Sequence, residues 1–298
     1  MPLLPLVGLL LLQAGNSTPL SASRIHELLH GMLMSDDEKQ GDAAHAELKG
    51  IFRQRGIPTI DEVGGDAAYE FVLMLCSPGP LRFQNQVLAK VREAAALGAV
   101  PADAAAYCAA HVQQEQLKAQ AGKQPATEPE LRDRIEQLYK SDQAVREKDA
   151  FDLEKMSGVD REHAAVLEEI FARYGVPTYA MVGQQAASDF VTMIQHQSAD
   201  FRQRVLPKLK QNVAAGQADP GSYATVFDRA QTDQGRSQRY GQNLVCDSAH
   251  PQLHTGPIED APHVNQRRAE IGLMRLEIYT QLVIAMSPDV CSGVPPAK

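Results

Sequence analysis

Residues 51–75 read IFRQRGIPTIDEVGGDAAYEFVLML, and residues 170–194 read IFARYGVPTYAMVGQQAASDFVTMI. The two stretches align without a gap at an offset of 119 residues (170 − 51), and 12 of the 25 aligned positions are identical. Self-similarity at this level indicates one structural unit that occurs twice in the chain. We therefore expect two homologous domains in tandem, copy 1 (residues 24–115) and copy 2 (residues 128–287).

Apolar side chains recur at helical spacing in both copies. In copy 2, Leu167, Ile170 and Phe171 fall at i, i+3 and i+4, which places them on one face of a helix. Gly56 and Gly175 follow this helix in the two copies, at the position where a helix C-terminus is expected. Further stripes of the same spacing predict two more helices in each copy, and the whole pattern indicates an all-α protein.

Polar and irregular segments set the predicted boundaries. Residues 116–127 are poor in apolar side chains and are expected to be a linker. Thr127 and Glu130 have the spacing of a capping box at the start of copy 2. Residues 236–262 lose the helical period, so we expect an irregular loop or a small β-hairpin there.

Two features are predicted at the end of the chain. A final helix is expected from about Val264 to Met286, because Ile271, Met274 and Ile278 fall on one stripe. Residues 288–298 are expected to form a tail.

The N-terminus contains an apolar run, LLPLVGLLLLQA at residues 3–14, of the length found in signal peptides. We expect residues 1–23 to be a signal peptide cleaved after Ala14 or Ser23, and the protein to be periplasmic or secreted. A buried N-terminal helix or a misplaced start is the alternative. The run is too short to span a bilayer comfortably, so no stable membrane insertion is expected after signal removal.

The 298 residues carry a net charge of −8, and 44% of them are hydrophobic. Binding to nucleic acid or to anionic lipid requires a basic surface, so neither is the expected partner. The oligomeric state remains open at this stage.

Four cysteines are present, Cys76 and Cys108 in copy 1 and Cys246 and Cys291 in the C-terminal part. In an exported chain they can form two intradomain disulfides. Free buried thiols are the alternative.

The residues that both copies share are almost all apolar, Gly or Pro, whereas most of the polar residues of copy 2 have no counterpart in copy 1. This difference predicts a polar site in copy 2 and a degenerate copy 1. The candidate site residues are Asp142, Arg146, Gln195, His196, Asp228, Arg229, Tyr240 and Arg267. Cys76 aligns with Gln195, so a disulfide between Cys76 and Cys108 could have replaced the polar site of copy 1 as a brace.

Copy 2 resembles domain-of-unknown-function family 6624 of bacterial proteins, over about Leu131 to Leu282. The resemblance rests on an ordered set of motifs: DxxxR at Asp142, GVP at Gly175, QH at Gln195, DR at Asp228, a YGxQ-like stretch at Tyr240 and RRxxxGL at Arg267. Two motifs depart from the usual pattern, since YGTQ reads YGQN and QHAD reads QHQS here. The resemblance implies site positions and no reaction.

His196 is expected at the C-terminal end of its helix, where the helix dipole favours a cation. A pair of His196 with Asp228, close to an arginine, could perform acid–base chemistry or bind an anion. The alternative is that His196, Asp228 and Arg229 form a buried network that braces the helices. The loop at Tyr240 either shapes a ligand pocket or is an ordinary turn.

Two groups of residues have side chains that could in principle bind a metal ion. His26, Glu27 and His30 form a literal HExxH sequence, whose spacing places both imidazoles on one helix face. The aligned residues of copy 2 are Glu136, Gln137 and Lys140, which indicates exposed positions on a repeat helix. His250, His254 and His263, with Asp247 and Asp260, lack a fixed spacing. We expect no metal and no cofactor.

The sequence therefore favours a binding or interaction module whose copy 2 pocket takes a small polar or anionic ligand or a peptide. One alternative is a metal-independent enzyme, such as a hydrolase, that uses His196 and Asp228. A second alternative is a purely structural protein.

Overall fold

The structure is a computed structural model that describes residues 20–33, 38–76, 79–123, 125–146, 152–247, 252–287 and 290–291, without the side chains of Glu38 and Leu153. Most of the expected signal peptide and most of the expected tail lie outside these residues. None of the helices in the described ranges is long and apolar enough to cross a membrane.

The protein is all-α, as the apolar periodicity predicts. The first six helices are α1 (Ala22–Leu33), α2 (Glu38–Arg55), α3 (Ile60–Val63), α4 (Gly65–Leu75), α5 (Leu81–Ala96) and α6 (Ala102–Ala121). The next six are α7 (Pro129–Ala144), α8 (Leu153–Tyr174), α9 (Tyr179–Val182), α10 (Gln184–Gln195), α11 (Ala199–Ala214) and α12 (Pro220–Thr232). The short 3-10 helix η2 (Ala261–His263) and helices α13 (Val264–Glu270) and α14 (Leu276–Met286) complete the set.

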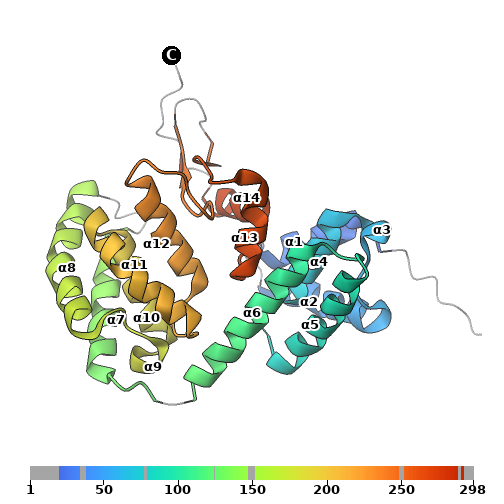
Figure 1. The fold of residues 1–298 in the computed structure, drawn as a ribbon, viewed down its shortest axis with the longest axis horizontal. Coiled ribbons are helices and arrows are strands. Elements are labelled where there is room, and N and C mark those ends of the chain that lie inside the picture. Colours follow the sequence, from blue (N-terminus) through green and yellow to red (C-terminus); the bar gives the residue numbers. More distant parts are fainter. Residues whose placement is uncertain are drawn as a thin grey trace, which may run out of the picture.

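These helices form two bodies, α1–α6 and α7–α12, with α13 and α14 between them (Figure 1). Each body has its own apolar core. Ala269 of α13 is buried in the core of α1–α6, and Met274 and Ile278 pack against that core. The last two helices therefore bind the C-terminal part of the chain to the N-terminal body.

Arg275 strengthens this contact at the start of α14. Its guanidinium donates from Nε and Nη2 to the two carboxylate oxygens of Asp103, at 2.6 and 3.0 Å, and from Nη1 to Asp66 at 2.9 Å. The same guanidinium lies over the ring of Tyr69, 4.1 Å from its centroid. A two-pronged pair of this kind fixes orientation as well as distance.

The two aligned stretches have the same local geometry. Thr59 and Thr178 cap the one-turn helices α3 and α9, each accepting a hydrogen bond from a backbone N–H three residues later. Gly64 and Gly183 follow with nearly equal dihedral angles, φ 86° and ψ 161° against φ 84° and ψ 168°. Both turns thus use a backbone conformation that is almost restricted to glycine.

The linker and the start of α7 differ from expectation. Helix α6 continues to Ala121, so the first half of the predicted linker is helical. The predicted capping box is wrong, because Glu128 is the N-cap of α7 and its side chain makes no capping bond. Thr127 instead donates its backbone N–H to the carbonyl of Ala180, which ties the start of α7 to α9.

The prediction of a single final helix is also wrong, since α13 and α14 are separated by a turn. Gly272 adopts φ 76° in this turn, and a Cβ there would lie 3.4 Å from the backbone N of His111. The chain therefore bends where it passes closely over α6. Apolar periodicity does not reveal the break, because both helices contribute to the same stripe.

The small β element and the two cysteine pairs agree with what the sequence predicts. Strands β1 (Leu244–Val245) and β2 (His254–Thr255) pair antiparallel. Both predicted cysteine pairs are disulfides, with Cα atoms 5.4 Å apart for Cys76 and Cys108 and 5.7 Å apart for Cys246 and Cys291. Disulfides are typical of oxidising compartments outside the cytoplasm.

Candidate functional site

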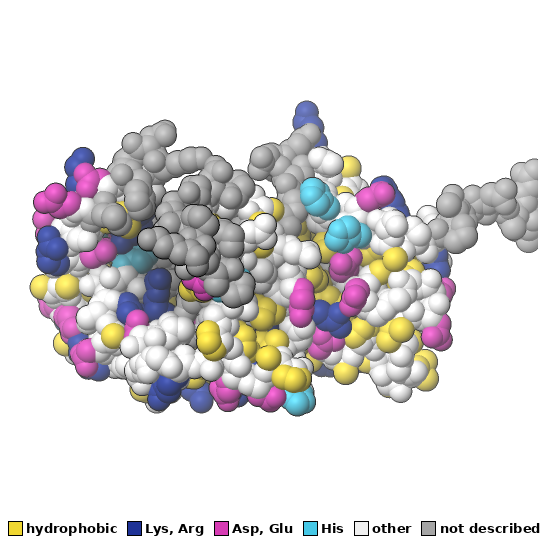
Figure 2. Space-filling view, turned by 90° about the horizontal axis from the view of Figure 1, so that it is seen from above, with side chains coloured by type: hydrophobic (Ala, Val, Ile, Leu, Met, Phe, Trp, Pro, Cys, Tyr) yellow, Lys and Arg dark blue, Asp and Glu magenta, His cyan; other side chains and the backbone are white. Residues whose placement is uncertain are grey.

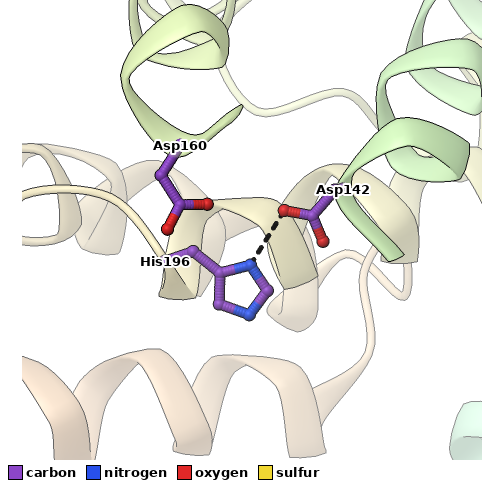
Figure 3. A group of neighbouring side chains, drawn as sticks. All are labelled: Asp142, Asp160 and His196. Carbon is purple, nitrogen blue, oxygen red and sulfur yellow. Dashed lines mark hydrogen bonds and ion pairs between the residues drawn. The ribbon is translucent and has the colours of Figure 1, made fainter. Parts of the chain in front are cut away.

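The first feature of the site is a histidine–aspartate pair. His196 is the C-cap of α10, and its Nδ1 lies 3.0 Å from Oδ1 of Asp142 at the end of α7 (Figure 3). The Asp142 side chain is 1% exposed, whereas that of His196 is 20% exposed. Nε2 of His196 has no hydrogen-bond partner in the described part of the chain. The ring is therefore held from one side and open on the other.

The Asp142 carboxylate is stabilised in its charged form. Burial by itself would raise its pKa, but the hydrogen bond to His196 and the charges of His196 and Arg146 outweigh burial, so the pKa lies below its usual value. Gln143 also donates to Oδ2 at 2.7 Å. Because an ionised carboxylate only accepts hydrogen bonds, Nδ1 of His196 carries the proton.

Arg146 connects this pair to a second carboxylate. Its Nη1 lies 3.0 Å from Oδ1 of Asp142, and its Nη2 lies 2.5 Å from Oδ1 of Asp160 on α8. One donor atom from each of Asp142, Asp160 and His196 falls within 4.8 Å of the others, which is close enough for a metal site. The guanidinium already bridges the two carboxylates, so a divalent cation would have to displace it. We therefore assign no metal to this cluster.

Asp228 does not pair with His196, and the predicted His196–Asp228 arrangement is wrong. Asp228 is fully buried and accepts hydrogen bonds from the backbone N–H groups of Arg239, Tyr240 and Gln242, at 2.7 to 3.1 Å. Burial raises its pKa, and these bonds oppose the rise. Asp228 therefore holds the loop that follows α12.

Arg229 lies where two guanidinium groups meet the end of α10. The carbonyl of Gln195 accepts from Nη1 of Arg202 at 3.0 Å and from Nη1 of Arg229 at 3.2 Å. Carbonyls in the last turn of a helix lack intrahelical partners and attract cations. Arg202 also has an ion pair with Asp233 at 2.7 Å. In the described part of the chain, no carboxylate lies within ion-pair distance of Arg229.

The Arg229 guanidinium is consequently a half-buried cation that has no counter-ion among the described residues. Burial and the positive charge of Arg202 lower its pKa, and Asp233 partly opposes this. A guanidinium has five N–H donors, of which one is used by the Gln195 carbonyl. The other four have no acceptor among the described residues.

Arg229 lines a cavity of about 470 Å³, here called the Arg229 cavity. Gln195, Gln242 and Asn243 line it as well, together with apolar side chains of β1 and α14. The amide nitrogen Nδ2 of Asn243 is buried and has no hydrogen-bond partner in the described structure. This volume falls in the range of small-molecule sites.

Tyr240 and Arg267 hold loops in place. The Tyr240 ring is buried beside Phe227, with centroids 6.0 Å apart. Arg267 donates to the backbone carbonyls of Arg239, Glu259 and Asp260. The sequence analysis assigned both residues to ligand binding, whereas the contacts seen for them are with the protein itself.

The two metal motifs do not assemble. His26 of the HExxH sequence contacts Glu70, at 3.4 Å. His254 pairs with Asp247 and His263 with Asp260, at 3.3 and 2.9 Å, while His250 lies outside the described residues. Among the described side chains, neither motif brings three ligand groups together.

Two residues at the site, Asp160 and Arg202, are not predicted by the sequence. Asp160 and Arg202 have no distinctive spacing, and helix packing alone brings them to the site. Asn243 belongs to the loop at Tyr240, for which the sequence leaves a ligand pocket and an ordinary turn as alternatives. A comparison of many related sequences would be the signal that could find Asp160 and Arg202.

On the face drawn in Figure 2, the described surface has no large patch of one charge sign, because acidic and basic side chains are interspersed.

The fold and the site together define an all-helical protein with an arginine-linked His–Asp pair and a polar cavity beside it.

The chain belongs to the Family of unknown function (DUF6624), whose sequence profile matches residues 129–287. This range contains every site residue described above. No curated protein and no solved structure matches the chain significantly.

Proposed function

We propose that the C-terminal part of the protein binds a small anionic or polar ligand, or the carboxylate end of a peptide, in the Arg229 cavity. The observation that carries this proposal is the half-buried Arg229 guanidinium, which faces a cavity and has no carboxylate partner in the described structure. A buried cation is costly unless an anion or several acceptors compensate for it.

A second donor group that lines the cavity points to the same ligand class. Nδ2 of Asn243 is buried without an acceptor, and such a group costs free energy in the unliganded protein. A ligand that presents oxygen acceptors would satisfy Arg229 and Asn243 together. Carboxylate and phosphate oxygens have the geometry that a guanidinium prefers.

The test is a titration of the full-length protein with phosphate, acetate and succinate, followed by calorimetry and by NMR. Arg229→Gln removes the charge and keeps an amide, and we expect binding at least tenfold weaker, about 1.4 kcal/mol. Asn243→Asp places a negative charge opposite the ligand and should weaken anion binding further.

Arg204→Gln is the matched control, because Arg204 is an exposed arginine on α11 whose partners are Glu168 and Asp200. It should bind all three anions like the wild type. Equal losses in both arginine variants would mean general surface electrostatics, and unchanged binding in Arg229→Gln would overturn the proposal.

Acid–base catalysis is the second candidate function, favoured by the His196–Asp142 pair. The buried carboxylate fixes Nδ1 as the donor, so in the neutral ring Nε2 carries the lone pair, and Nε2 faces away from both carboxylates (Figure 3). A base in this state can accept a proton from a substrate or a water molecule. Asp142 thus orients the His196 ring, a role that the sequence predicted for Asp228.

Diethyl pyrocarbonate tests this arrangement, since it acylates an accessible neutral imidazole nitrogen. We expect modification of His196 by mass spectrometry, and loss of any hydrolysis of p-nitrophenyl esters or phosphates in His196→Gln. An unreactive His196 together with equal activities of wild type and variant would reject the catalytic role.

We also propose that α1–α6 and α7–α12 arose by duplication. The support is that equivalent backbone bonds recur: Ile60 N donates to Ala99 O at 2.8 Å, and Tyr179 N donates to Gln217 O at 3.1 Å. On this reading the Cys76–Cys108 disulfide replaced the polar site of the first copy, and the Cα separation of 5.4 Å meets the geometric requirement.

The export proposal is that residues 1–23 are a signal peptide and that the mature protein is periplasmic or secreted. The two disulfides support it, since such bonds persist outside reducing compartments. Cell fractionation with N-terminal sequencing tests it: a mature chain that begins after Ala14 or Ser23 supports export, and an intact chain in the cytoplasm rejects it.

A further inference from the structure

A second cavity, of about 390 Å³, lies between α6 and the C-terminal helices and is here called the α6 cavity. Tyr107, His111, Gln114 and Lys118 form one wall, at positions that share a single face of α6. The start of α12, the turn after α13, and α14 form the opposite wall. The N-terminal body and the C-terminal part therefore build this cavity jointly.

Two polar atoms on the α6 wall are buried and have no partner in the described structure. They are Nε2 of His111 and Oε1 of Gln114, three residues apart and so on adjacent turns. Buried polar atoms in folded proteins are nearly always hydrogen-bonded, and each exception requires an explanation. Both residues line the same cavity, and a ligand in it would supply the missing partners.

The His111 ring is positioned and uncharged. It stacks on Tyr107 with an interplanar angle of 19° and centroids 5.7 Å apart. Burial lowers its pKa, although Glu115 partly opposes this, so the neutral ring predominates at neutral pH. A neutral imidazole offers one hydrogen-bond donor and one acceptor.

The charged side chains on the cavity wall already have partners within the protein. Lys118 pairs with Glu115 at 3.1 Å, and Asp219 accepts the backbone N–H of Ser222 at 2.7 Å as the cap of α12. Arg268 donates to the carbonyls of Met274 and Tyr240, both at 2.6 Å. Arg268 thus has two carbonyl acceptors and the Tyr279 ring, whose centroid lies 4.9 Å from its guanidinium carbon, whereas Arg229 has one carbonyl acceptor. This wall therefore favours an uncharged ligand.

We propose that the α6 cavity is a second binding site, for a small uncharged compound with a ring or other flat apolar body and at least one O–H or N–H donor. The donor would bond to Oε1 of Gln114, and a neighbouring polar group would bond to Nε2 of His111. The apolar body would pack against Tyr107, Tyr279 and Leu282. The α6 cavity and the Arg229 cavity share Thr225, Gln242 and Tyr279 in their walls, but Gln114 and His111 line only the α6 cavity, and Arg229 lines only the other.

The test uses four benzene derivatives of similar size with the full-length protein: phenol and benzamide as neutral probes, benzoate and benzylammonium as charged ones. Binding is measured by saturation-transfer NMR and by shifts in protein spectra. We expect the neutral donors to bind at least tenfold more tightly than either ion, and the perturbed signals to include those of α6 residues.

Gln114→Leu and His111→Phe provide the decisive variants, because both preserve side-chain size while removing an unpartnered polar atom. We expect each to weaken probe binding at least tenfold and to raise the melting temperature, by about 2 °C or more. If Gln114 and His111 had only a structural role, both substitutions would lower the melting temperature instead. Gln120→Leu, an exposed position on the same helix, should change neither property.

Three results would overturn the proposal. They are preferential binding of an ion, unchanged probe binding in both variants, and the absence of binding of both neutral probes by the wild type. Anion titration of Gln114→Leu keeps the two sites distinct, since phosphate and succinate binding at Arg229 should be unaffected.

Discussion

Nδ1 of His196 and Nη1 of Arg146 both lie 3.0 Å from the same oxygen of Asp142, whose side chain is almost completely buried. One carboxylate thus joins the end of α7 to the end of α10. Its ionised form is favoured because these two cationic or proton-donating neighbours outweigh the cost of burial. The stability of the protein should depend on pH through this group.

The first prediction concerns acid unfolding. The pKa of Asp142 is depressed in the folded state, so its stabilising contribution is present above the unfolded value of about 3.9 and is lost as pH falls through the folded value. Urea unfolding at pH 7 and at pH 3 should show a smaller acid-induced loss of stability in Asp142→Asn than in the wild type. Asp133→Asn, at an exposed position on α7, should titrate like the wild type.

Asp228→Asn should be strongly destabilising. The carboxylate accepts hydrogen bonds from three backbone N–H groups through its two oxygens, and a side-chain amide would keep one oxygen and turn its N–H donors toward the backbone donors at the other. We expect a loss of about 2–4 kcal/mol in the free energy of unfolding, measured in urea. Asp200→Asn is the control, since Asp200 is highly exposed and should change stability by less than about 0.5 kcal/mol. A neutral Asp228→Asn would contradict the structural role.

Arg275 is predicted to hold the two bodies together. Arg275→Ala leaves Asp103 without its two-pronged partner and exposes Tyr69, so a loss of about 2–3 kcal/mol is expected. Hydrogen exchange should become faster in α13 and α14 before it does in α7–α12. Arg132→Ala removes an exposed arginine and serves as the matched control. Uniform exchange changes in all helices would argue against a local tie.

Removal of the Cys76–Cys108 disulfide should cost about 3–4 kcal/mol, because it closes a loop of 32 residues. The measurement is urea unfolding of the Cys76→Ala/Cys108→Ala double variant against the wild type without reductant. The corresponding variant of Cys246 and Cys291 tests the second pair. Wild-type stability that does not change on full reduction would contradict the prediction.

Gly64→Ala and Gly183→Ala should be destabilising by similar amounts, about 1–3 kcal/mol each. A Cβ at either position meets no atom within 4 Å, so the cost comes from the backbone conformation and not from a clash. Thermal unfolding of the two variants checks this. Clearly unequal losses would show that the two turns are not energetically equivalent, and Gly65→Ala, at an ordinary helical φ, is the control.

Much of the fold follows from local patterns. Apolar spacing predicts α8, α10 and α11, and Asp219 with Pro220 marks the start of α12, because these signals act within one or two turns of the chain. The cysteine pairs were also predictable, since each pair lies within one half of the sequence. The break between α13 and α14 was not, because it arises where Gly272 passes over α6.

The candidate site also has features that follow from the sequence and others that depend on tertiary packing. The sequence by itself determined that polar residues such as His196 and Arg229 lie in copy 2 without counterparts in copy 1, because a comparison within one chain separates apolar scaffold positions from the rest. Only the tertiary structure decided that Asp142, and not Asp228, holds the imidazole. Helix packing brings together side chains that are 54 residues apart, and no local pattern encodes which of several carboxylates will meet a given ring.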